Sequence, residues 1–234
     1  MSAKSRTFSA GLMKSCSRQV SAGRSAPHVE SLERRQLLAG NVSVVGGENF
    51  TATITGDKKA NSIDIRLSGT DGYLIRGLGG TKINGAAEVL LKSSISAFFN
   101  ISLGKGNDFV SIVGPVNTQT VSILTGDGND RVSLSQVSHF GDLKISTGKG
   151  KDFVALSTVS VTRALAIDTG ADNDAIQFAA VQAEGNASVS GGKGKNTLTG
   201  SAQLNVAGAK TISALKLAKT ENRDKDDDDD DDDD

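Results

Sequence analysis

The 234-residue chain has few of the residues from which disulfide frameworks, aromatic cores and membrane spans are built. Its one cysteine, Cys16, excludes an intramolecular disulfide and a cysteine-based zinc site. It has no tryptophan and one tyrosine, Tyr73, which argues against a large aromatic core and an aromatic platform for sugars. No run approaches the roughly 18 apolar residues of a membrane-spanning helix. The sequence therefore predicts no transmembrane segment.

Charge is nearly balanced over the whole chain, at −1, but it is unevenly distributed. Residues 1–40 are rich in serine and carry seven Lys or Arg against two Glu, whereas residues 224–234 carry ten Asp and one Lys. The lysines between these ends lie scattered beside aspartates and form no basic stripe, so nucleic acid is not an expected partner. We predict a basic leader over 1–40, a folded region over 41–218, and a disordered acidic tail over 219–234.

The folded region has the pattern of short strands and turns. Apolar and polar side chains alternate in runs such as Ser62–Leu67, and Gly, Asn and Asp residues separate the runs. A glycine loop then recurs every 22 residues, marked by Gly104, Gly126, Gly148, Gly170 and Gly192. Apolar residues keep the same step in further columns, such as Val110, Val132, Val154, Ile176 and Leu198. So many aligned columns indicate a true structural repeat.

A side chain repeated once per coil stacks on its equivalent in the next strand, about 4.8 Å away. Val132 and Leu134, two residues apart, point to the same face of a strand, so we place them inside and Ser133 outside. The repeat predicts an all-β fold: a right-handed, three-sided parallel β-helix, or β-solenoid, with 22 residues per coil. Regular coils are expected over about 99–200, with polar caps over 41–60 and 205–218.

The glycine loops read GKGNDFV, GDGNDRV, GKGKDFV, GADNDAI and GKGKNTL. They resemble the calcium-binding nonapeptide G-G-x-G-x-D-x-U-x of RTX repeats, where U is a large apolar residue. The resemblance implies Ca²⁺ as a ligand, with loop carbonyls completing an oxygen shell around the carboxylates. The implied metal ligands are Asp108, Asp130, Asp152 and Asp174. Asp127 is added because its loop has two acids and no lysine.

The same loops allow a second interpretation without calcium. The first glycine of the motif is replaced by Leu103 in one loop and by threonine in the next three, and several loops contain lysine. Aspartates stacked about 5 Å apart repel by roughly 1 kcal/mol in bulk water and about 3 kcal/mol at an effective dielectric near 20. Calcium, the loop lysines, or backbone amides of the turns would each compensate this repulsion. Structural turn chemistry and calcium binding therefore both stay open.

The leader closes with the sequence SLERRQLLAG at 31–40. This run resembles the LEPR-x-LL element near the N-termini of many planctomycete exported or surface proteins, with Arg34 in place of the proline. Residues 49–91 resemble the opening portion of the same repeat proteins. The resemblance implies a bacterial protein whose leader is a targeting segment and whose location is extracellular or at the cell surface.

No residue set has the pattern of an active site. The two histidines, His28 and His139, have no catalytic motif around them, and the repeat offers acids only in its loop column. We predict no catalytic residues and a structural, adhesive or matrix role, with cell-surface polymers, matrix polymers or copies of the chain itself as partners. The alternative is a carbohydrate-active β-helix lyase or hydrolase. Charged residues clustered in an exposed groove along one sheet would favour that enzyme.

Overall fold

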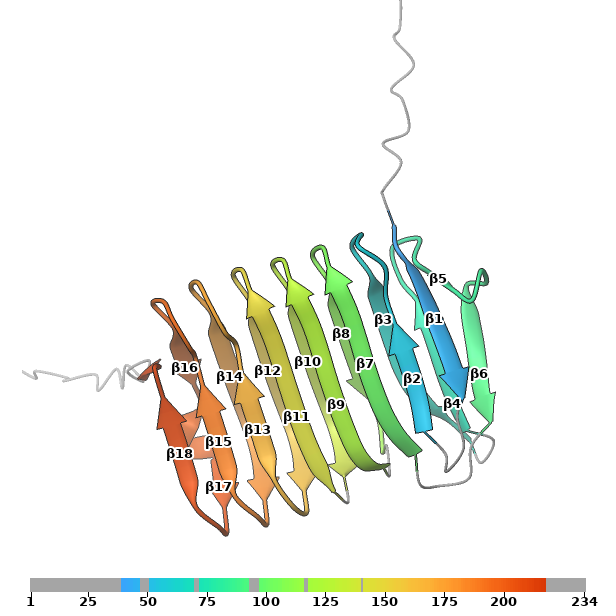
Figure 1. Ribbon diagram of the computed structural model, residues 1–234. Helices are drawn as coiled ribbons and strands as arrows, with labels where there is room; N and C mark the ends of the chain where they lie inside the picture. Colours follow the sequence, from blue (N-terminus) through green and yellow to red (C-terminus); the bar gives the residue numbers. More distant parts are fainter. Residues whose placement is uncertain are drawn as a thin grey trace, which may run out of the picture. The chain divides into compact units, whose positions relative to one another are not determined.

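The computed structural model describes the chain in six segments, which are residues 39–46, 51–69, 72–92, 97–115, 118–139 and 141–217. These segments form a stack of coils whose strands line up in two long sheets (Figure 1). The predicted all-β parallel solenoid is therefore confirmed. Residues 1–38 of the predicted leader, which include Cys16 and His28, and the predicted acidic tail lie outside the described residues.

The first sheet contains nine strands, whose bounds are β1 (Asn41–Gly46), β2 (Thr51–Thr55), β5 (Lys82–Ile83), β7 (Ala97–Lys105), β9 (Thr118–Asp127), β11 (Asp142–Lys149), β13 (Leu165–Asp168), β15 (Ala187–Ser190) and β18 (Lys210–Ser213). Their spatial order is β18-β15-β13-β11-β9-β7-β2-β1-β5. From β2 to β18 all neighbours pair in parallel, as expected for a chain that returns to the same sheet once per coil.

The second sheet consists of β3 (Ser62–Ser68), β4 (Gly72–Gly77), β6 (Glu88–Lys92), β8 (Phe109–Val113), β10 (Arg131–His139), β12 (Phe153–Val161), β14 (Ala175–Ala183), β16 (Thr197–Thr199), β17 (Leu204–Val206) and β19 (Lys216–Leu217). Their order is β19-β16-β14-β12-β10-β8-β3-β4-β6, and β17 pairs with β14. A short 3₁₀ turn, η2 (Ser201–Gln203), precedes β17.

Apolar columns fill the interior of the stack. Val132, Val154 and Ile176 pair in register across β10, β12 and β14, and each is at most 1% exposed. The other apolar columns of the repeat are buried in the same way, except that Pro115 lies exposed at the position that is Val137, Val159 and Val181 in later coils. Each fully buried aliphatic side chain contributes about 1.5–3 kcal/mol. The alternation of inward and outward residues therefore fixes which face of each strand is buried.

The second sheet bends along a line of residues with positive φ. Gln136, Thr158 and Ala180 have φ values of 56°, 55° and 54°, and each interrupts a long strand in the same place. The segments after the bend pair with one another, as Val137 does with Val159. The bend gives these coils a short additional strand segment, as a three-sided coil requires. In the last full coil, the same strand is split into β16 and β17.

The stack begins one coil earlier than the repeat indicates. β2 and β3 already pair in parallel with β7 and β8, with Thr51 opposite Phe98. That step is 47 residues (98 − 51), so 25 more than the usual 22 are inserted between these coils. The insertion includes β4 and β6, which pair antiparallel to the sheet. The segment 41–60 is therefore a cap only in part, because β2 belongs to the first coil.

The other end also differs from the predicted cap. β18 pairs in parallel with β15, and β19 with β16, so residues 210–217 continue both sheets. Leu204 pairs with Val181, a step of 23 residues (204 − 181) rather than 22. The single extra residue places Leu204, rather than Gln203, beside the buried Val181. The segment 205–218 is thus largely a further, incomplete coil.

Glycine is required where neighbouring loops touch. Gly126 has φ +109°, and a Cβ built on it would lie 1.8 Å from the carbonyl oxygen of Gly104 in the preceding coil. Gly114 has a similar φ of +101°, but nothing lies within 4 Å of its Cβ position. Substitutions at these two glycines therefore distinguish the cost of backbone strain from the cost of a clash between coils.

We expect Gly114→Ala to cost about 1–2 kcal/mol of unfolding free energy, because only the positive φ is strained. Gly126→Ala should cost clearly more, since the new methyl group also forces two loops apart. Urea unfolding of the full chain followed by circular dichroism measures both values. Equal losses in the two variants would contradict the close packing of the loops.

Candidate functional site along the glycine loops

One glycine loop per coil lies along a single edge of the solenoid, where strands of the first sheet pass into the second (Figure 1). Each of four loops carries an aspartate in the same place, and all four side chains are buried, with exposed fractions of 2–3%. These residues are Asp108, Asp130, Asp152 and Asp174. The structure therefore brings four of the five predicted metal ligands into one column inside the stack.

The buried aspartates accept hydrogen bonds from the backbone of the neighbouring coil. In each rung, the backbone N–H of one residue donates to Oδ1 of its equivalent in the next coil, over N···O distances of 2.7–2.9 Å. We call this series the aspartate ladder, and its members are Asn61, Asp108, Asp130, Asp152, Asp174 and Asn196. A buried N–H without an acceptor costs about 1–3 kcal/mol. Each ladder side chain therefore fastens one coil to the next.

Asparagines at both ends show what the second side-chain atom can do. Asn61 Nδ2 donates to the carbonyl of Lys59 at 2.7 Å, and Asn196 Nδ2 donates to the carbonyl of Gly191. The aspartates have Oδ2 in place of Nδ2, and an ionised carboxylate has no hydrogen to donate. In the part of the chain that the structure describes, Oδ2 of all four aspartates has no hydrogen-bond partner.

Three buried threonines stand beside the ladder. Thr125 Oγ1 donates to the carbonyl of Thr147 at 3.2 Å, and Thr147 Oγ1 donates to the carbonyl of Thr169 at 3.1 Å. The Thr125 hydroxyl also lies close enough to the Asp130 carboxyl to oppose the rise of its pKa. The Thr125 hydroxyl nevertheless donates to the carbonyl of the next coil, so Asp130 Oδ2 has no hydrogen-bond partner among the described residues. A protonated Oδ2 could donate to this hydroxyl oxygen, whereas an ionised one could not.

Burial raises the pKa of every aspartate in the ladder. The pKa of Asp108 rises from the usual 3.8 to about 7 and that of Asp152 to about 6, mainly through loss of hydration. Backbone N–H donors of Asn61 and Asp130 oppose these shifts, and the charge of neighbouring aspartates adds to them. Burial raises the pKa of Asp130 and Asp174 in the same direction.

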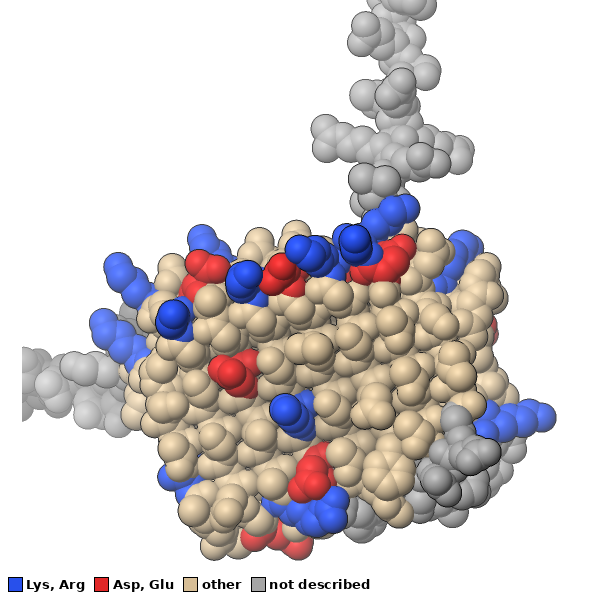
Figure 2. Space-filling model, in the orientation of Figure 1, with Lys and Arg blue, Asp and Glu red and all other residues tan. Residues whose placement is uncertain are grey.

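Asp127 lies on the outer side of the loops, apart from the ladder. Its carboxylate pairs with Lys105 Nζ at 3.2 Å and with Lys149 Nζ at 3.8 Å, and its side chain is 45% exposed. Acidic and basic side chains follow this edge of the solenoid (Figure 2). Such exposed pairs contribute at most about 1 kcal/mol each. Asp127 therefore balances the charge of the loop surface more than it stabilises the fold.

A second, exposed ladder runs beside the first one. Asn129 N–H donates to Asn107 Oδ1 at 2.9 Å, and Lys151 N–H donates to Asn129 Oδ1 at 2.8 Å. Lys195 N–H donates to Asn173 Oδ1 at 2.8 Å in a later pair of coils. The sequence signal for this ladder was the asparagine before three of the four loop aspartates. Both ladders use the turn's side chains to satisfy backbone amides across coils.

Calcium binding needs six to eight oxygen ligands around one ion. In the ladder, Oδ1 of each aspartate is already engaged by an N–H group, so one carboxylate oxygen per coil is left. Over the six described segments, no group of three or more His, Cys, Asp or Glu side chains is arranged to hold a metal ion. The described side chains thus fit a calcium shell poorly, and calcium binding stays a prediction.

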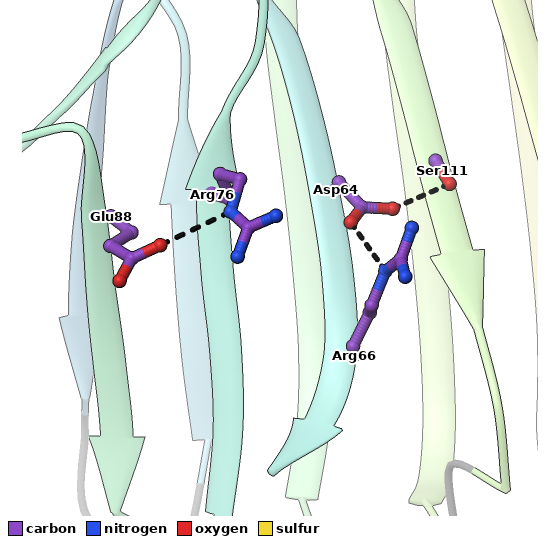
Figure 3. Close-up of polar contacts among 5 residues, drawn as sticks. All are labelled: Asp64, Arg66, Arg76, Glu88 and Ser111. Carbon is purple, nitrogen blue, oxygen red and sulfur yellow. Dashed lines mark hydrogen bonds and ion pairs between the residues drawn. The ribbon is translucent and has the colours of Figure 1, made fainter.

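A row of polar side chains crosses the second sheet near its first coil (Figure 3). Asp64 Oδ1 accepts from Ser111 Oγ at 2.8 Å, and Asp64 Oδ2 pairs with Arg66 Nε at 2.6 Å. Glu88 pairs with Arg76 at 3.1 Å on the neighbouring strands. Apart from Ser111, these residues lie outside the 22-residue repeat, so the loop-column analysis missed them. Asp64 is 4% exposed, and its internal contacts make it a cross-strand link rather than an open catalytic group.

The raised pKa values predict a solenoid that is more stable in mild acid. The folded state holds these protons more tightly than the unfolded chain, so unfolding free energy should fall as the pH rises from 3.8 through about 6 and about 7. For Asp152, the shift from 3.8 to about 6 corresponds to about 3 kcal/mol. Urea unfolding at a series of pH values measures the slope. Asp152→Asn should reduce this slope. An unfolding free energy that rises between pH 3.8 and about 7 would contradict the burial of these carboxyls.

Comparison of the chain with protein families, with curated proteins and with solved structures finds no match. Within the described segments, no helix is long and apolar enough to cross a membrane. The function must therefore come from the geometry of the stack, and the aspartate ladder is its most regular chemical feature.

Proposed function

We propose that the protein is a non-catalytic, exported β-solenoid with a structural, adhesive or matrix role at the cell surface. The aspartate ladder is the observation that carries this proposal. The acids that repeat from coil to coil hold backbone amides inside the stack, where a substrate does not reach them. The repeat is therefore suited to building length and stiffness.

Export is supported by the resemblance of residues 31–40 to the planctomycete LEPR-x-LL element. The outer loop surface, with lysines and acids in alternation, offers a polar face for cell-surface or matrix polymers (Figure 2). A carbohydrate-active enzyme is the second candidate. It would have to use the polar row around Asp64, whose oxygens are engaged by Ser111 and Arg66.

Substitution at the centre of the ladder tests the structural role of its carboxyls. Asp130→Ala removes the acceptor of the buried Asp108 N–H and should cost about 1–3 kcal/mol of unfolding free energy. Asp130→Asn keeps the acceptor and adds the donor seen at Asn196, so it should be at least as stable as the parent chain at about pH 8. An Asn variant as unstable as the Ala variant would contradict the proposal.

The same two variants decide between turn chemistry and calcium. Each is placed in a full chain whose Asp226–Asp234 run is changed to Asn, so that the acidic run does not bind Ca²⁺ diffusely. A structural ladder predicts melting temperatures that do not respond to Ca²⁺ or EDTA. Binding tighter than about 1 mM that raises the melting temperature, and that Asp130→Asn abolishes, would establish calcium sites instead.

Export predicts that the full chain reaches the cell surface and that a chain lacking residues 1–38 stays inside the cell. Biotinylation of intact cells with a membrane-impermeant lysine reagent measures this, because loop lysines such as Lys105 and Lys149 are exposed. A cytoplasmic protein serves as the control for leakage. Equal labelling of the full and shortened chains would argue against the leader as a targeting segment.

A further inference from the structure

The last coil of the solenoid carries positive charge alone. Residues 187–217 contain four lysines and no Asp or Glu. All four lysines are exposed, and none forms an ion pair with a residue in the described segments. We call this end of the stack the basic end, and its lysines are Lys193, Lys195, Lys210 and Lys216. Earlier in the stack, by contrast, Lys105 and Lys149 share the carboxylate of Asp127.

The basic end also has unpaired strand edges. β18 and β19 are the last strands of their sheets, so their outer backbone groups have no further strand to pair with among the described residues. A shallow groove beside them is lined by Ser201 and Ala202 of η2 and by Lys210, Ile212, Leu215 and Leu217. Leu217 is 59% exposed. Basic side chains project at this end of the stack (Figure 2). An open edge with exposed apolar side chains invites pairing with another chain unless something covers it.

The chain itself supplies a segment of opposite charge. Asp226–Asp234 begins nine residues after Leu217 (226 − 217), and the last described strand ends at Leu217. Nine residues span at most about 30 Å when extended, which is enough to reach across the end of the stack. The segment 224–234 carries ten aspartates and one lysine, against the four lysines of the basic end. Tethering keeps its effective concentration near these lysines in the millimolar range.

We propose that the acidic run Asp226–Asp234 of the same chain binds the basic end and covers the open edges of β18 and β19. A second copy is a poorer occupant, because two basic ends brought face to face would place eight lysines together (4 + 4). The acidic run removes the charge excess of the last coil and surrounds its exposed apolar side chains with carboxylates. It thereby blocks end-to-end pairing of solenoids, as charged residues at strand edges generally do.

Hydrogen exchange of the full chain tests this docking. In low salt, amides of residues 210–217 should exchange at least about fivefold faster when Asp226–Asp234 are changed to Asn, because their cover is lost. Changing the same nine residues to Glu keeps the charge and should preserve protection. Salt of about 1 M should remove the difference between the Asp and Asn chains, since the Debye length falls to about 3 Å. Amides of β11 and β12 should not respond.

Carbodiimide cross-linking then identifies the partner of the acidic run. The proposal predicts links within monomers from the run to Lys193, Lys195, Lys210 and Lys216, and none to Lys58 or Lys82 at the other end of the stack. Links found only in dimers would assign the surface to a second copy and overturn the proposal. Unchanged protection of residues 210–217 in the Asn variant, or equal linking to lysines along the whole solenoid, would overturn it as well.

Discussion

The hydrogen bond from one loop's backbone N–H to the side-chain oxygen of Asp or Asn in the next loop is the interaction on which the rest of the structure depends. It occurs once per coil, inside the stack, at distances of 2.7–2.9 Å. Apolar columns supply most of the burial, but they allow neighbouring coils to slide, since one valine fits beside another. A buried backbone N–H opposes such a slip, because the slip would remove its hydrogen-bond acceptor. The ladder therefore sets the register that the core then fills.

Keeping carboxyls in this place has an electrostatic consequence. The neutral amide of Asn196 satisfies its whole side chain, whereas each aspartate has a raised pKa and an Oδ2 without a hydrogen-bond partner among the described residues. The inner row thus favours protonated acids, while the outer carboxylate of Asp127 is balanced by lysines. Charge on this protein is organised by depth: carboxyls with raised pKa values lie inside, ion pairs follow the loops, and the lysines of the last coil form no ion pair with a described residue.

The 22-residue step was enough to predict the solenoid, its parallel pairing and the buried columns of its regular coils, because side chains in a stack repeat with the backbone. It could not reveal the first coil, since an insertion between β3 and β7 hides the match of Asn61 with Asp108. Nor could it decide where the loop aspartates point. A G-x-G-N-D turn suits an outward metal ligand and an inward hydrogen-bond acceptor equally well. The asparagines that begin and end the column were the signal for the second arrangement.

Titration of the aspartate carboxyl carbons by nuclear magnetic resonance is the most direct test of the ladder. The account predicts a distinct group of carboxyls that titrate well above the usual range, with Asp108 near pH 7 and Asp152 near pH 6, and that do not shift when Ca²⁺ is added. Carboxyls of all four loop aspartates that titrate at or below 3.8, and that shift on addition of Ca²⁺, would contradict it. These carboxyls would then be exposed metal ligands rather than buried hydrogen-bond acceptors that link neighbouring coils.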